Sequence, residues 1–94
     1  MTREAYQRGD WQAVIDAHSL ESHDPQEWLR YAVALLQSMV PGLDVGKQHQ
    51  LAALAFMQAE KEGATKEEVL AAQRQSVLLC LQQALSLSGL QKFG

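Results

Sequence analysis

Three histidines and one cysteine are the side chains of this 94-residue chain best suited to hold a metal ion or attack a substrate. His18 and His23 are five residues apart, so a helix would place them on different faces, and His49 has no partner at ligand spacing. Cys80 lies in an apolar run and is expected in the core, where a thiol behaves as a small hydrophobe. We therefore expect no metal site and no cofactor: His18 should pack at a helix end, and the other two histidines should be solvated.

Acidic side chains are the remaining candidates for catalysis. Four glutamates surround Gly63, but lysines alternate with them, as is typical of a solvated helix connection: Glu60, Glu62, Glu67 and Glu68. The sequence contains no Gly-x-Ser-x-Gly nucleophile elbow, and its glycines occur singly rather than in a phosphate-binding loop. We predict no catalytic residue and a protein that is not an enzyme.

Charge and length exclude several classes of partner. Eleven acidic against eight basic side chains give a net charge of −3, which offers no electrostatic footprint for nucleic acid or anionic lipid. No apolar stretch approaches the roughly 18–20 residues that a membrane span needs. A chain of 94 residues supports one domain, residues 1–94, with one modest core. We expect a single cytoplasmic domain that binds neither nucleic acid nor membrane.

The elements that position these residues are predicted to be helices, because Leu, Ala and Gln dominate and β-branched residues are few. Asp24-Pro25 is a strong helix start, and Thr65 with Glu68 forms a capping box. Glycine and proline mark the ends, including a turn at Pro41-Gly42 and a stop at Gly89. The fold class is all-α, with five antiparallel helices expected near residues 3–8, 11–22, 25–40, 44–62 and 66–88.

A repeat signal suggests how these helices are arranged. The turns around Asp10 and Asp44 lie 34 residues apart, a period typical of helix-turn-helix repeats. The segment Ala5–Ile15, followed by Asp24-Pro25-Gln26-Glu27-Trp28 and Tyr31-Ala32, resembles a tetratricopeptide unit that runs into the next one. The resemblance covers roughly the first half of the chain, and the last two helices are longer than those of the family. It implies stacked helical hairpins, while a free-standing small helix bundle is the alternative.

The resemblance also points to a binding face, because this family presents its A helices to ligands. Residues 25–40 would be such a helix, and one of its two apolar stripes would face the concave groove: Leu29, Val33, Leu36 and Gln37. The family's carboxylate-clamp members carry basic and asparagine side chains there, so we expect an apolar helix or extended segment as ligand. The alternative is that this stripe packs against the last helix in a closed bundle.

The last predicted helix is apolar around most of its circumference, so it must be covered on several sides. Either it is the central helix of the domain, or its outer face is an interface that could support a homodimer. We interpret the chain as a non-enzymatic helical module that binds another protein, or itself, through an apolar helix face. The alternatives are a small helical bundle that holds a hydrophobic ligand, and a small enzyme or accessory subunit of an enzyme complex.

Overall fold

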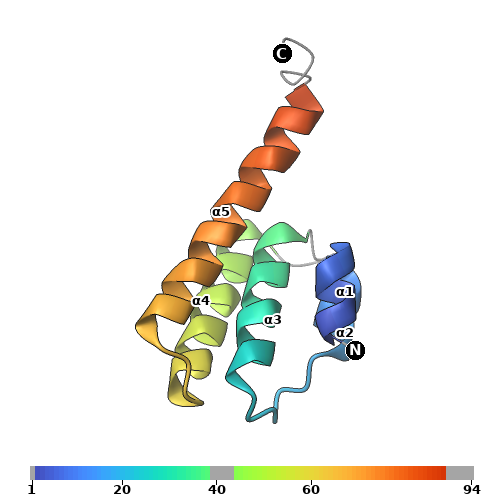
Figure 1. Cartoon of the computed structure of the whole chain (residues 1–94). Coiled ribbons are helices and arrows are strands. Elements are labelled where there is room, and N and C mark those ends of the chain that lie inside the picture. Colours follow the sequence, from blue (N-terminus) through green and yellow to red (C-terminus); the bar gives the residue numbers. More distant parts are fainter. Residues whose placement is uncertain (1, 39–43, 89–94) are drawn as a thin grey trace.

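The computed structural model describes residues 2–38 and 44–88, and the predicted all-α fold is confirmed over these residues, which contain no strand (Figure 1). The predicted turn at Pro41-Gly42 and stop at Gly89 lie outside the described residues. The helices are α1 (Thr2–Arg8), α2 (Trp11–Ala17), α3 (Pro25–Gln37), α4 (Val45–Lys61) and α5 (Lys66–Ser88).

Local capping explains where the best-predicted helices begin. The Asp24 carboxylate accepts a hydrogen bond from the Gln26 amide at 2.9 Å, and Pro25 occupies the first turn of α3. At the start of α5 the Glu68 amide donates to the Thr65 hydroxyl at 3.1 Å, and the Thr65 amide donates to the Glu68 carboxylate at 3.0 Å. This reciprocal pair is the capping box that the sequence predicts.

The second helix is shorter than predicted. It ends at Ala17, with His18 as its C-terminal cap, whereas the expected helix covered 11–22. The Ser22 hydroxyl instead accepts a hydrogen bond from the Asp24 amide at 3.1 Å, so the chain forms local turns before α3. Serine side chains commonly compete with helix in this way, because their oxygen bonds nearby backbone amides.

Helix α3 is the centre of the domain, because it contacts each of the other four helices. The other contacting pairs are α1 with α2 and α4 with α5, so successive helices form adjoining hairpins (Figure 1). The largest contact joins α3 and α4, where Ala52, Ala55 and Ala59 are buried and let the two helices approach closely. The buried Gln48 amide of α4 donates to the carbonyl oxygens of Leu35 and Ser38, which satisfies acceptors at the end of α3.

Helix α5 is not the central element, although its apolar composition allowed that interpretation. Its 23 residues correspond to roughly 34 Å of helix, and its C-terminal half extends beyond the other helices (Figure 1). Val69 and Ser76 are buried on its inner face. The prediction that Cys80 is buried is wrong: this cysteine is exposed and borders an open hollow between α4 and α5.

Candidate interaction surface

The four predicted partner-binding residues do not share one exposed face. Leu29 and Val33 are only 6% and 0% exposed and belong to the main core cluster, to which Val69 of α5 also contributes. They therefore stabilise the packing of α3 and present almost no surface to a partner. This agrees with the alternative in which the stripe packs against the last helix in a closed bundle. The reason is that α3 has neighbours on all sides, so both of its apolar stripes are covered.

Gln37 and Leu36 lie at the edge of this core instead. The Gln37 side-chain amide donates to both the carbonyl and the hydroxyl oxygen of Ser76 at 2.9 Å, and its nitrogen lies 3.2 Å from the Cys80 sulfur. Gln37 thus fastens the middle of α5 to the end of α3. Leu36 is half-buried and borders an open hollow between α4 and α5. Of the predicted residues, Leu36 borders this hollow, and Leu29 lines a separate, more polar cleft.

The hollow between α4 and α5, hereafter the α4–α5 hollow, has a volume of about 520 Å³. Its base includes Leu36 and Phe56, and the sides of the two helices form its walls. It is open to solvent and mostly apolar, which suits an apolar side chain presented by a partner. The remaining lining residues are His49, Ala52, Ala53, Gln73, Ser76, Val77 and Cys80.

A row of exposed apolar side chains follows the outer face of α5, opposite the buried face. We call it the outer stripe: Leu70, Val77, Leu78 and Leu81 are 49%, 67%, 58% and 52% exposed. Leu70 lies seven and eight residues before Val77 and Leu78, and Leu81 lies four and three residues after them. These separations place all four side chains on one side of a helix. Val77 also borders the α4–α5 hollow, so the stripe and the hollow form one continuous apolar surface. Apolar residues all around the predicted helix were the sequence signal for this surface.

Helix α4 carries a second exposed apolar region on its other side. Leu51, Leu54 and Met57 are 39%, 58% and 65% exposed there, and Leu20 from the turn before α3 lies nearby. Together they border an open hollow of about 380 Å³. This region faces away from the α4–α5 hollow, since the buried alanines of α4 lie between the two, and it therefore offers independent control positions.

Aromatic stacking holds the turn after α2 against α3. The His18 ring stacks on Tyr31 with centroids 4.1 Å apart and meets Trp28 edge-on at 4.4 Å. Both ring nitrogens of His18 are buried without a hydrogen-bond partner. Burial lowers the pKa of His18, and the Glu27 carboxylate opposes that effect only in part. The predicted packing of His18 at a helix end is confirmed, and its environment favours the neutral ring.

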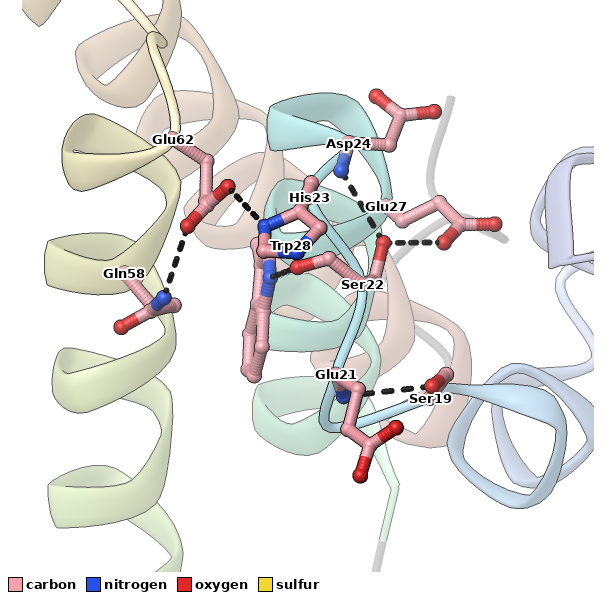
Figure 2. Close-up of polar contacts among 9 residues, drawn as sticks. All are labelled: Ser19, Glu21, Ser22, His23, Asp24, Glu27, Trp28, Gln58 and Glu62. Atoms are coloured by element: carbon pink, nitrogen blue, oxygen red, sulfur yellow. Dashed lines mark hydrogen bonds and ion pairs between the residues drawn. The ribbon is translucent and has the colours of Figure 1, made fainter.

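Polar contacts fasten the same turn to α3 and α4 (Figure 2). The Trp28 indole donates to the Ser22 carbonyl at 2.9 Å, and the Ser22 hydroxyl donates to Glu27 at 2.7 Å. His23 Nδ1 lies 3.0 Å from a Glu62 carboxylate oxygen. The His23 side chain is 90% exposed, as predicted, so this pair contributes little to stability. The arrangement positions the connecting turn against α3 and α4.

A more polar cleft of about 380 Å³ lies across α1, α3 and α5. Arg3, Arg30 and Glu68 are its charged side chains, and glutamines supply much of the remaining polar lining. A hydrogen bond from the Thr65 backbone and one from Gln26 lower the pKa of Glu68, which makes this carboxylate a weaker base. The described residues contain no group of three or more potential metal ligands. The cleft can offer charge and hydrogen bonds, but it lacks a positioned base.

Comparisons of the chain with protein-family models, curated proteins and solved structures found no match. Within the described part of the chain, no helix combines the length and apolar character needed to cross a membrane. Over the described residues the structure is a small all-α domain with exposed apolar surfaces on α4 and α5.

Proposed function

We propose that this protein is a non-enzymatic helical module of the cytoplasm that binds another protein, or a second copy of itself, through the apolar surface of α5. The observation that carries the proposal is the outer stripe, whose four large side chains are about half exposed or more. Large contiguous apolar patches are rare on proteins that act alone, and they commonly mark protein interfaces.

A tetratricopeptide-like architecture is part of the proposal. Each helix contacts its hairpin partner, and α3 contacts the helices on both sides of it, which is the order of contacts that stacked hairpins require. The cleft across α1, α3 and α5 is lined by α3, which the resemblance assigns as an A helix, and by the helices that lie two before and two after it. These contacts support a short stack of hairpins in which none of the other described helices covers the outer face of α5.

The shape of the hollows favours a protein partner over a hydrophobic small molecule. A carrier of such a ligand encloses most of the ligand surface in a cavity. The hollows beside α4 are instead open to solvent, and a long exposed stripe on α5 adjoins one of them. A helix or extended segment of a protein can cover such a surface along its length, whereas a small ligand would cover only part of it.

The test is capture of binding proteins from an extract of the source cells by three immobilised variants. Leu81 in the outer stripe and Leu54 in the opposite apolar region of α4 are similarly exposed, at 52% and 58%. We expect the wild-type chain and Leu54→Glu to capture the same protein and Leu81→Glu to lose it, with all three equally helical by circular dichroism. Equal capture by the two glutamate variants, or capture of nothing specific by the wild type, would contradict the proposal.

A further inference from the structure

The outer stripe of α5 has the spacing of a helix seam that pairs with another helix. Leu70, Val77 and Ala84 recur every seven residues. Arg74 and Leu81 are also seven residues apart, and they lie four residues after Leu70 and Val77 respectively. These are the d and a positions of a heptad repeat. All five side chains are exposed, so no helix of the described residues covers this seam.

We propose, on the basis of the interaction function above, that the partner of α5 is the α5 helix of a second copy, paired antiparallel. The pairing places Leu81 against Val77 of the second copy on both sides of a twofold axis. The same register places Arg74 opposite Ala84. A long side chain then lies against a small one, so the Arg74 stem can cover Ala84 while its guanidinium reaches solvent.

Charge favours this antiparallel arrangement over a parallel one. A parallel pair in register would bring Arg74 against Arg74 at the seam, and like charges in contact are destabilising. The antiparallel register separates these two residues by roughly 15 Å along the helix axis. The segment from Gln75 to Ser88 contains no charged residue, so the two projecting halves meet no other like charge at the centre of the pair. The same absence of charge gives no electrostatic preference for a different partner.

The α4–α5 hollow completes the arrangement. It opens beside Gln73, Val77 and Cys80, and in the antiparallel register this part of α5 lies next to the projecting half of the second copy. Side chains of that half can enter the hollow and cover Leu36 and Phe56. The two copies of α4 and α5 then form a four-helix arrangement in which both projecting halves are covered.

The first measurement is the mass in solution by light scattering over a range of concentrations. We expect the wild-type chain to reach twice 10.4 kDa at high concentration. Val77→Glu should weaken the dimer at least tenfold, because it places two carboxylates near the twofold axis. The control Met57→Glu changes a residue of α4 that is 65% exposed, against 67% for Val77, and should dimerise normally. Equal effects of the two variants would overturn the inference.

The second measurement reports orientation by disulfide formation in a Cys80→Ser background. Arg74→Cys chains mixed with Ala84→Cys chains should form a mixed disulfide, and neither chain alone should form a homodimeric one. The two positions are roughly 15 Å apart within one helix, which is beyond the Cα separation of about 7 Å that a disulfide spans, so the bond reports pairing between copies. Homodimeric disulfides of each single variant would indicate parallel pairing and overturn the antiparallel register.

These outcomes also separate the dimer from the broader interaction function. A wild-type chain that stays monomeric at the highest concentration, yet captures a different protein through Leu81, would overturn the dimer and leave the interaction function intact. A monomer that also shows no capture dependent on Leu81 would overturn both.

Discussion

Replacing Leu29 with alanine tests whether this residue belongs to the core or to a binding groove. Leu29 is 6% exposed and packs in a cluster with Val33 and Val69. Truncating a buried leucine to alanine costs about 2–5 kcal/mol, from lost transfer free energy and from the cavity left behind. A 94-residue domain has a total stability of about 5–14 kcal/mol. We therefore expect Leu29→Ala to lose a large part of the free energy of unfolding.

The assay is urea unfolding followed by tryptophan fluorescence at one fixed protein concentration. With a denaturant slope of about 1–2 kcal/mol/M, a loss of about 3 kcal/mol lowers the midpoint by roughly 1.5–3 M. Leu54→Ala is the matched control: Leu54 is 58% exposed, so this truncation should cost under about 1 kcal/mol. An equally small loss in the free energy of unfolding for both variants would refute the assignment of Leu29 to the core. It would instead favour a position for Leu29 in a binding groove.

Three further predictions concern the N-cap of α3, the His18 ring, and the hydrogen bonds that join Gln37 to α5. Asp24→Ala removes the N-cap of α3 and should cost about 1 kcal/mol in urea unfolding. Folding lowers the pKa of His18 below 6.5, so the unfolded chain binds protons more readily. Stability should be full above pH 6.5 and fall as the pH drops below it; His18→Phe should flatten this slope, and an unchanged slope would contradict it. Gln37→Ala removes the bonds to Ser76 and should cost about 1–2 kcal/mol, with faster amide exchange in the second half of α5 as the distinguishing readout.

The parts of the fold that depend on residues close together along the chain could be predicted from the sequence. The Asp24 and Thr65 caps act within one helical turn, so their residue types determine where α3 and α5 begin. The end of α2 depends on residues farther along the chain. His18 leaves the helix to stack on Tyr31, and Ser22 is held by the Trp28 indole. A local pattern contains no signal for such contacts.

The candidate interaction surface was the least predictable feature. The periodicity of apolar residues shows which of them share a helix face, but it does not show which face is covered by other helices. Helix α3 has two apolar stripes, and both are buried because this helix has four neighbours. Helix α5 is also apolar on several sides, yet only the side with Val69 and Ser76 is buried. The difference lies in the order of the helices: α3 contacts all four other helices, whereas α5 contacts only α3 and α4 among the described helices.

The outer face of α5 is covered by none of the other described helices. A helix face that meets only solvent normally carries polar side chains. Leu70, Val77, Leu78 and Leu81 instead leave the outer face of α5 apolar. Gln37 holds this helix at its middle, so one half rests on α3 while the other extends from it (Figure 1). In the proposed antiparallel pair, the same apolar surface of α5 in each copy would cover both halves of this helix.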